Sequence, residues 1–471
     1  MIGQIEEVRR RLREGNLPEA LLAPEGGSIG GLGRTALRER SGAVAGGLAK
    51  LGVRQGDRVG LYAANSVDWI LAYLGGLRLG ATMVPFNPAY KTAEVEHILG
   101  DADPILVVAD EERAAGVEGR LPVVPLGDLP LDEPPHLPPL TAESPALIIY
   151  TSGTTGRPKG ALLDHGNLLA QARGAIEAWR WTTADRLVHA LPLFHVHGLA
   201  MGLHGSLLTG CEMTLIDFDT ARVVTELEGG GSLFFGVPAM YQRLCDHLEE
   251  HPADLSRVRL FVSGSAPLPP ELFRRCERLL GQPPLERYGI TEGGIVVSNP
   301  YDGPRQPGRV GFPFAGVEVR LGGAGEIQLK GGQVFSGYWR NAAATEESFV
   351  DGWFRTGDVG EIGEDGSLAI KGRIKELIIS GGFNVYPREV ELVLEAHPGV
   401  AEVAVVGLPS KSWGEEVTAF VVPAGDPPPA AQDLIVFAQE RLAKFKCPRA
   451  VRFVDVLPRN AMGKVQRSLL K

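Results

Sequence analysis

The segment 150–160 has the composition of a phosphate-binding loop. It contains Tyr-Thr-Ser-Gly-Thr-Thr-Gly-Arg-Pro-Lys-Gly and follows an apolar run at 146–149 that predicts a buried strand. Glycines allow a tight turn whose backbone N–H groups point at one anion, while hydroxyls and a lysine add donors and positive charge. The loop is not a Walker A loop, because Pro158 precedes the lysine and Gly160 follows it. A polar hairpin is the alternative, but so specific a run favours a polyphosphate site.

Four further motifs carry side chains suited to nucleotide chemistry. Tyr288 offers a ring face for adenine, and Glu292 offers an oxygen ligand for Mg²⁺. Asp358 can accept hydrogen bonds from both ribose hydroxyls, and Arg373 can contact ribose or phosphate. Lys464 can offset negative charge in a transition state, although each of these residues, taken singly, also fits an ordinary surface turn. The motifs are Tyr-Gly-Ile-Thr-Glu at 288–292, Arg-Thr-Gly-Asp at 355–358, Gly-Arg-Ile-Lys-Glu at 372–376 and Pro-Arg-Asn-Ala-Met-Gly-Lys at 458–464.

In this order, the five motifs resemble those of AMP-forming acyl-CoA synthetases and related adenylating enzymes over nearly the full chain. The resemblance implies a ligase that uses ATP, Mg²⁺ and CoA and forms an acyl-adenylate before the thioester. The ATP contacts that it implies are Thr151, Ser152, Gly153, Thr154, Thr155, Gly156, Lys159, Ser265, Ala266, Pro267, Glu286, Arg287, Tyr288, Gly289, Thr291, Asp358, Arg373 and Lys464. The catalytic residues that it implies are Thr155, His195, Glu292 and Lys464, with Thr155 and Glu292 as the Mg²⁺ ligands.

The resemblance also implies two domains. The first is a large α/β domain at 1–374, with parallel-rich αβα sheets and a β-rich subdomain. The second is a small mobile α+β domain at 375–471 that rotates between the two half-reactions. Lys375 matches the hinge, and Gly381 and Gly382 match the CoA channel.

Arg287 is the main indication of which acid is activated. An arginine beside an acyl pocket is costly to bury without an anion, and a second carboxylate on the substrate would supply one. Arg243 is a candidate further contact, as is a hydroxyl from Ser263 or Ser265, and the resemblance places His195 at the pocket. His197 is another candidate, with a purely structural histidine as the alternative. For Arg287 the alternative is an ion pair with a protein glutamate.

Four segments resemble the malonyl-CoA synthetases of this family in particular. They lie at 191–199, 235–243, 285–292 and 298–308. The resemblance implies malonate as the substrate, with methylmalonate or a longer diacid left open because Gly293 and Gly294 would widen or loosen the pocket. The alternatives are a ligase for a monocarboxylic fatty or aryl acid and an adenylating enzyme that loads a carrier protein, the latter disfavoured.

Two weaker patterns point to other chemistry. Gly-Leu-Gly-Arg-Thr-Ala at 31–36 matches a dinucleotide-binding string, but no clear strand precedes it. Five of the ten histidines fall between His165 and His204, yet no cysteine or carboxylate completes a zinc site. A catalytically silent nucleotide-binding module is a further alternative, which the loop with Lys464 argues against.

Composition limits the function classes. With 471 residues, 44% of them hydrophobic, the chain can form two or three domains with a large core. A net charge of −10 argues against nucleic acid as the main partner. Four scattered cysteines predict buried, reduced thiols. Without a signal-peptide core or an uninterrupted apolar span, the sequence predicts a soluble, cytoplasmic enzyme of small molecules, and it does not predict the oligomeric state.

The elements that must position these residues alternate between helix and strand. The predicted helices lie at 36–51 and 68–79, and the predicted strands at 57–63 and 105–109. This alternation predicts an α/β fold with a mainly parallel sheet covered on both faces. The proline-rich segment 121–145 predicts a surface connection, and Pro387 predicts the first turn of a helix.

Overall fold

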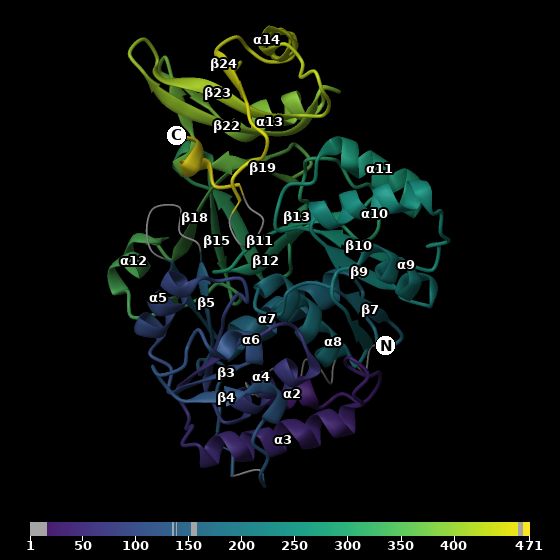
Figure 1. Ribbon diagram of the computed structural model, residues 1–471, viewed down its shortest axis with the longest axis vertical. Coiled ribbons are helices and arrows are strands. Elements are labelled where there is room, and N and C mark those ends of the chain that lie inside the picture. The colour runs from purple at the N-terminus through teal and green to yellow at the C-terminus, as the bar shows by residue number, and fades with distance from the viewer. Residues whose placement is uncertain (1–16, 134–135, 138, 152–157, 460–464) are drawn as a thin grey trace. The chain divides into compact units, whose positions relative to one another are not determined.

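The computed structural model describes residues 17–133, 136–137, 139–151, 158–459 and 465–471 (Figure 1). The chain forms two compact units, which are Met1–Val319 with Leu329–Phe354, and Arg320–Gln328 with Arg355–Lys471. The second unit thus includes antiparallel strands that precede residue 374. The domain boundary between 374 and 375 therefore stays a prediction.

The first sheet of the first unit carries the strands on either side of the predicted phosphate loop. Its order is β16-β6-β5-β2-β1-β3-β4, with β1 to β5 parallel where they pair and with β6 antiparallel to both β5 and β16. The strands are β1 (Arg58–Tyr62), β2 (Thr82–Pro85), β3 (Leu106–Ala109), β4 (Val123–Pro125), β5 (Pro145–Thr151), β6 (Lys159–Asp164) and β16 (Gly337–Tyr338). The helices are α2 (Leu17–Leu22), α3 (Arg34–Lys50), α4 (Val67–Arg78), α5 (Thr92–Ala102) and α6 (Glu111–Ala114).

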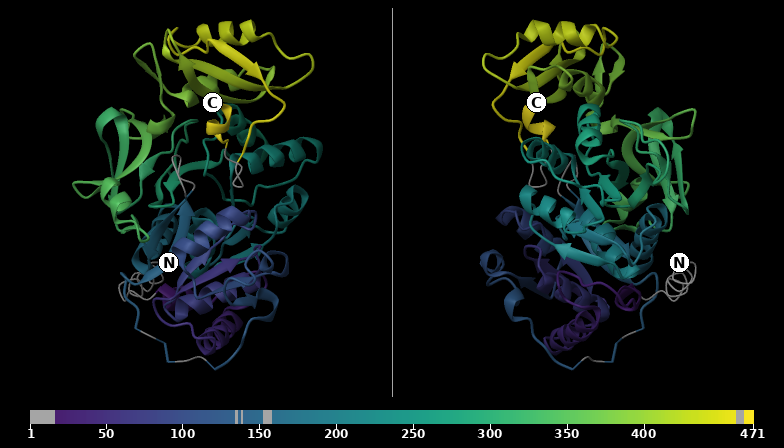
Figure 2. Two further views of the ribbon diagram at one scale, coloured as in Figure 1. Left: turned by 60° about the vertical axis from the view of Figure 1, so that its left-hand side comes forward. Right: turned by 90° about the vertical axis from the view of Figure 1, so that its right-hand side faces the viewer.

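The predicted elements of this region are confirmed to within about two residues. The helices predicted at 36–51 and 68–79 are α3 and α4, which pack against each other (Figures 1 and 2). Ser66 caps α4 by accepting a hydrogen bond from the Trp69 N–H. The predicted surface connection at 121–145 is partly wrong, because its start forms β4 at the edge of the sheet.

The second sheet of the first unit carries Arg287 and Tyr288 on β11. Its order is β13-β12-β11-β10-β9-β7-β8, parallel except for the antiparallel β12 and β13. The strands are β7 (Arg186–His189), β8 (Glu212–Leu215), β9 (Leu233–Gly236), β10 (Leu260–Ser263), β11 (Leu285–Ile290), β12 (Gly294–Ser298) and β13 (Phe312–Pro313). The helices are α7 (His165–Ala178), the π-helix η2 (His197–Leu203), α8 (His204–Thr209), α9 (Thr220–Glu228), α10 (Pro238–Glu250) and α11 (Pro270–Leu280). Helix α12 (Ala342–Glu347) contacts β16 of the first sheet. Ligands of such sheets bind beyond the carboxyl ends of the parallel strands, where the predicted site residues cluster.

The second unit combines a hairpin, which belongs to a sheet of order β14-β15-β18-β17 with β19 beside β18, and a mixed sheet. The other strands of the hairpin's sheet are β14 (Val317–Leu321), β15 (Glu326–Gly331) and β17 (Phe349–Val350). The hairpin is β18 (Trp353–Ile362) with β19 (Leu368–Arg373), and η4 (Ile374–Glu376) follows it. The mixed sheet has the order β21-β20-β23-β22 with β24 beside β23, and it contains β20 (Ile378–Ser380), β21 (Phe383–Val385), β22 (Val400–Ser410), β23 (Gly414–Pro423) and β24 (Ala450–Phe453). Its longest strands, β22 and β23, have 11 and 10 residues.

Both helices of the second unit pack on one face of this sheet (Figure 2). They are α13 (Pro387–Glu395) and α14 (Ala431–Gln439), whose apolar side chains share a core with alternate residues of β22 and β23. Pro387 is the first residue of α13, as the sequence predicts. The opposite face packs against residues such as Leu457 and Leu470, the latter in η5 (Arg467–Leu470).

The four cysteines are buried and free, which confirms the predicted thiols. Within the described ranges, no helix has both the length and the apolar composition needed to cross a bilayer. Likewise, the described residues contain no group of three histidine, cysteine, aspartate or glutamate side chains that could hold a metal ion, so they give the zinc alternative no support.

A buried histidine gives the first unit a pH-dependent stability. His165 begins α7 and is fully buried, and neither ring nitrogen has a hydrogen-bond partner among the described residues. Burial lowers its pKa to about 4, because the protonated ring would lose its hydration.

We expect His165→Leu to flatten the dependence of stability on pH below neutrality. As the pH falls through 6.5, the unfolded chain binds a proton that folded His165 does not bind until about pH 4. The wild type therefore loses about 2 kcal/mol of unfolding free energy from this residue between pH 7 and pH 5. Urea unfolding at the two pH values measures the loss, with the exposed residue His251 changed to leucine as the control. An equal loss in wild type and His165→Leu would contradict the assignment.

Candidate active site

The two strands that flank the predicted phosphate loop are joined at its base. Thr151 ends β5 and pairs with Lys159 at the start of β6, and the Thr151 hydroxyl donates to the Lys159 carbonyl oxygen at 3.4 Å. Both residues therefore border the predicted loop, and their contacts with ATP stay predictions. Some predicted residues lie outside the described residues: Ser152, Gly153, Thr154, Thr155, Gly156 and Lys464.

Tyr338 connects the loop lysine to the predicted magnesium ligand. The ammonium of Lys159 lies 5.1 Å from the centre of the Tyr338 ring, and the Tyr338 hydroxyl donates to Glu292 Oε1 at 2.9 Å. Burial and then the Glu292 charge raise the pKa of Tyr338, so its hydroxyl keeps the proton that it donates. The Phe335 N–H also donates to the backbone carbonyl of Glu292 at 2.7 Å. Sequence reasoning missed Tyr338, because a single tyrosine after a glycine carries no chemical signal.

Glu286 and Tyr288 share one face of β11. Glu286 is buried, and its Oε1 accepts the N–H of Leu268 at 2.9 Å, which fixes the turn that contains Ser265, Ala266 and Pro267. Tyr288 follows two residues later and is nearly buried, and Gly289 and Thr291 come directly after it. Glu286 is thus placed to shape the predicted nucleotide site through the turn that it holds.

Arg287 points to the opposite face of β11 and forms a polar cluster with Ser265 and His197. Its guanidinium lies so close to Gly264 that a Cβ there would be 2.3 Å from Arg287 Nε. Ser265 has a left-handed backbone with φ of 68°. Its hydroxyl lies 3.0 Å from His197 Nδ1 and 3.5 Å from Arg287 Nη2.

This cluster is positive and lacks a protein carboxylate among the described residues. Arg287 is 6% exposed, forms no ion pair there, and its Nε has no hydrogen-bond partner. Burial lowers the pKa of Arg287 to about 9, which still leaves the guanidinium charged at neutral pH. Burial and then the Arg287 charge lower the pKa of His197 well below its usual value, so its ring is neutral. His197 Nε2 also has no partner within the described ranges, and the cluster therefore suits an anion.

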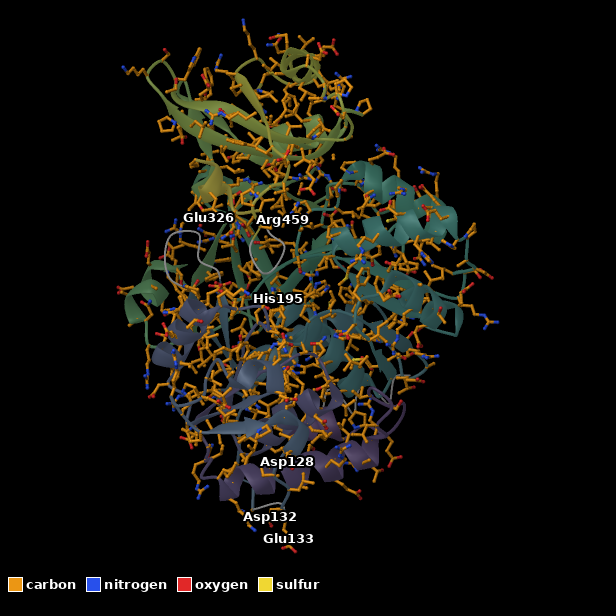
Figure 3. The ribbon with its side chains drawn as sticks, viewed as in Figure 1. Asp128, Asp132, Glu133, His195, Glu326 and Arg459 are labelled. Carbon is orange, nitrogen blue, oxygen red and sulfur yellow. The ribbon has the colours of Figure 1, made fainter. Side chains whose placement is uncertain are left out.

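The other predicted acyl residues are not all brought to this cluster. His195 (Figure 3) accepts the His197 N–H on its Nδ1 at 3.3 Å and therefore lies beside it. Ser263 pairs with Glu286, so alternation along the strands places its side chain on the face opposite Arg287. Arg243 is exposed on α10, with its guanidinium 5.0 Å from the centre of the Phe218 ring. Acyl contacts from Ser263 and Arg243 stay predictions.

Gly294 does not leave open space. Its φ is 62°, and a Cβ there would lie 2.2 Å from Cδ of Gln171, a buried residue of α7. The volume beside Gly294 is thus occupied by Gln171, whereas a Cβ on Gly293 would meet its nearest neighbour at 3.4 Å. Sequence reasoning missed Gln171, because nothing in the chain relates it to residue 294.

The second unit holds the predicted ribose and hinge residues. Asp358 is buried, and its Oδ1 lies 2.9 Å from Arg373 Nε. Glu326, labelled in Figure 3, accepts hydrogen bonds from the Arg355 side chain at 3.0 Å and from the Gly357 N–H at 3.2 Å. The hydrogen bonds to Glu326 and the ion pair between Asp358 and Arg373 fix the Arg-Thr-Gly-Asp turn. Lys375, the predicted hinge residue, is exposed and lies in η4.

Gly381 and Gly382 form the exposed turn between β20 and β21, both with positive φ. Trp413 contacts this turn, since a Cβ on Gly381 would lie 2.8 Å from the indole. Arg449 lies 3.5 Å from the centre of the Trp413 ring. This aromatic and basic surface borders the predicted CoA channel, and sequence reasoning did not single it out.

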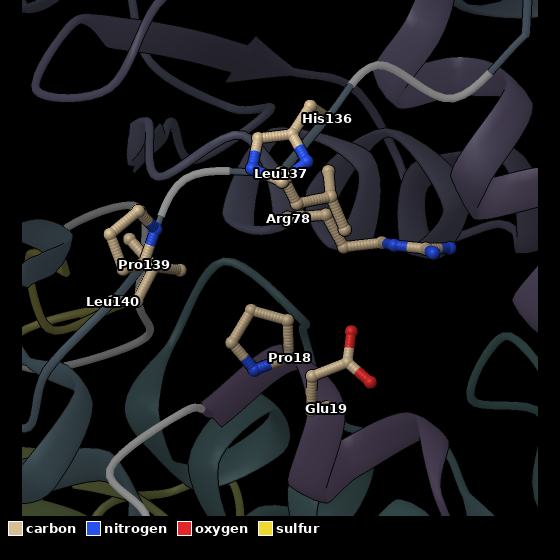
Figure 4. Close-up of a pocket in the computed structure, with 7 residues that line it drawn as sticks. All are labelled: Pro18, Glu19, Arg78, His136, Leu137, Pro139 and Leu140. Atoms are coloured by element: carbon tan, nitrogen blue, oxygen red, sulfur yellow. The ribbon is translucent and has the colours of Figure 1, made fainter.

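A separate cavity of about 390 Å³ lies in the first unit (Figure 4). Its lining includes Glu19 of α2, Arg78 of α4 and His136. Arg78 donates to the Arg38 carbonyl at 2.7 Å and the Ser41 hydroxyl at 3.1 Å. None of the predicted site residues is among the described residues that line it.

Residues 33–339 match the AMP-binding enzyme family, and residues 389–464 match the C-terminal domain of AMP-binding enzymes. The chain belongs to the AMP-binding enzyme family. The ATP-bound crystal structure of MatB from Rhodopseudomonas palustris has a TM-score of 0.91 and 38% identity to this chain, and the match covers 97% of this chain and 98% of that one. This comparison confirms the predicted fold class and the resemblance.

Two curated relatives differ in the acid that they name. The malonate–CoA ligase of Arabidopsis thaliana is 34% identical over an alignment of 479 positions, which covers 89% of this chain and 78% of that one. The feruloyl-CoA synthase of an Amycolatopsis species is 37% identical over an alignment of 469 positions, which covers 95% of this chain and 94% of that one. The chain is therefore an AMP-forming acyl-CoA ligase, as predicted, while relatedness alone does not decide its acid.

We expect Tyr338→Phe to weaken the metal-dependent step while the protein still folds. The substitution keeps a ring beneath Lys159 and removes only the hydrogen bond to Glu292. Losing a hydrogen bond to a carboxylate corresponds to about a tenfold or larger drop in kcat/KM for ATP. Pyrophosphate release, measured across a range of Mg²⁺ concentrations, should show a raised Mg²⁺ requirement. Tyr73→Phe, which removes a buried hydroxyl bonded to His204, is the control, and an unchanged requirement in Tyr338→Phe would argue against the link.

Proposed function

We propose that this enzyme activates malonate, and methylmalonate as a second substrate, and joins it to CoA to give the acyl-CoA, AMP and pyrophosphate. The observation that carries the proposal is the buried Arg287, which has no carboxylate partner among the described residues. A substrate with two carboxylates would react through one and place the other against this guanidinium. The malonate–CoA ligase among the relatives supports the proposal.

In the first half-reaction, one carboxylate oxygen of malonate would attack the α-phosphorus of ATP. The bond from that phosphorus to the bridging oxygen would break, and pyrophosphate would leave. Thr151 and Lys159 would hold the phosphates, and Tyr288 would contact the adenine. The Glu292 carboxylate, oriented by Tyr338, is a ligand type that suits Mg²⁺, and the ion would offset phosphate charge.

In the second half-reaction, the CoA sulfur would attack the acyl carbon, and AMP would leave with the bridging oxygen. Arg287, His197 and Ser265 would keep the distal carboxylate in place throughout, through charge-assisted hydrogen bonds. Neutral His197 adds a polar contact without adding a second positive charge. Lys375 as the hinge, and Gly381 with Gly382 at the CoA channel, belong to this proposal.

The first test compares pyrophosphate release with ATP and Mg²⁺ for six acids, with and without CoA. The acids are malonate, methylmalonate, succinate, acetate, octanoate and ferulate. A profile led by malonate, with CoA converted to its thioester, supports the proposal. The second candidate is a monocarboxylic aryl acid, favoured by the feruloyl-CoA synthase among the relatives, and a profile led by ferulate would select it.

We expect Arg287→Met to raise the KM for malonate by about tenfold or more, because a charge-assisted hydrogen bond is lost. The kinetics measured with acetate should not worsen, since acetate has no second carboxylate. Arg278→Met, which changes an exposed arginine of α11, is the matched control. Equal malonate kinetics in Arg287→Met and wild type would exclude the diacid site.

We expect Lys464→Ala to abolish adenylation but to spare thioester formation from supplied malonyl-adenylate. A lysine that offsets charge at the α-phosphate acts only while pyrophosphate leaves. The two half-reactions can be assayed separately, by pyrophosphate release and by consumption of the CoA thiol. Equal loss of both half-reactions would contradict this role.

A further inference from the structure

Helix α5 contacts both strands that flank the phosphate loop. Nε2 of His97 donates to the carbonyl oxygen of Pro158 at 2.7 Å, one residue before β6 begins. Near the end of β5, the Tyr150 hydroxyl donates to Asp101 Oδ2 at 2.6 Å. His97 and Asp101 are four positions apart and therefore lie on one side of the helix. In Figure 1, α5 lies beside β5.

A third contact connects α5 to Trp339, which directly follows β16, the strand that pairs with β6. The Trp339 indole donates to the backbone carbonyl of Asp101 at 3.2 Å. The Trp339 N–H in turn donates to the Gly160 carbonyl at 2.8 Å. Asp101 thereby binds Tyr150 directly and is connected to Gly160 through Trp339, while His97 of the same helix binds Pro158.

These bonds are not what attaches α5 to the sheet. The helix already buries Val95, Ile98 and Ala102 in the core that covers β1 and β3. His97 is only partly buried and lies outside that core, yet its bond reaches the loop rather than the helix's own neighbours. The side chains of His97 and Asp101 form their hydrogen bonds next to the ends of β5 and β6 that border residues 152–157.

We propose that His97 and Asp101 are positioning residues that hold the β5 and β6 ends of the phosphate loop in place against α5, in addition to the pairing of Thr151 with Lys159. Backbone N–H groups bind phosphate best when they are oriented before the ligand arrives, because ordering them later costs affinity. A helix that holds both loop ends would supply that order. The inference rests on the proposed role of 151–160 as the ATP loop and adds residues from outside every motif.

The test uses Tyr150→Phe and His97→Phe, which each remove one hydrogen-bonding group and keep an aromatic ring. We expect the dissociation constant for ATP, measured by calorimetry without acid, to rise about three- to tenfold in each variant. The KM for the acid and the rate of thioester formation from supplied acyl-adenylate should stay unchanged. A general loss of structure would instead change all three quantities.

The matched control is Tyr62→Phe. Tyr62 is a buried tyrosine of β1 in the same sheet, and its hydroxyl donates to the Tyr90 carbonyl at 3.0 Å, away from the loop. It should lose thermal stability comparable to Tyr150→Phe but bind ATP as the wild type does. If it weakens ATP binding as much as Tyr150→Phe does, the role of α5 is only structural and the inference is wrong.

Asp101→Asn provides a conservative rescue, because its amide oxygen can still accept from Tyr150. We expect its dissociation constant for ATP to lie between those of the wild type and Tyr150→Phe. If Tyr150→Phe does not fold, the two single variants Asp101→Asn and His97→Phe decide the outcome. Unchanged ATP binding in the variants would overturn the inference and leave the proposed function standing. A wild-type protein that does not bind ATP would overturn the proposed function itself.

Discussion

The buried guanidinium of Arg287 is the constraint on which the acyl site depends. A charge held away from water is costly unless an anion meets it, and no described carboxylate does so. Its surroundings accommodate that charge: Gly264 leaves room for the guanidinium, Ser265 adopts a left-handed backbone to reach it, and His197 stays neutral. A strained non-glycine residue at such a place is retained where function requires its geometry. The arrangement is therefore consistent with a site completed by its substrate.

Most of the fold could be predicted because local signals agree with the final packing. The spacing of apolar residues located α3 and α4, and Pro387 marked the start of α13. The extent of the second unit could not be predicted, because the glycine-rich hairpin of β18 and β19 looks the same in sequence whichever unit it joins. Local sequence patterns indicate which residues form a hairpin. The unit to which the hairpin belongs depends on contacts between residues far apart in the chain.

The site was predictable where a motif concentrates chemistry and unpredictable where one side chain acts from elsewhere. The motifs single out Tyr288, Glu292 and Asp358, whose roles stay predictions. Tyr338 and Asp101 were missed, because their partners lie 46 and 49 positions away. Register also matters, since only the pairing of β10 with β11 reveals that Ser263 and Arg287 face opposite sides.

The predicted phosphate loop and the proposed acyl site belong to different sheets of the first unit. The phosphate loop belongs to the sheet with β5 and β6, while the acyl cluster belongs to the sheet with β11. The hydrogen bond from Tyr338 to Glu292 joins them, because Tyr338 lies on β16 of the first sheet and Glu292 follows β11 of the second. If the acid binds at Arg287 as proposed, a change of acid can arise on that face of β11 without disturbing the loop. Such a separation would let relatives that name different acids share one adenylating framework.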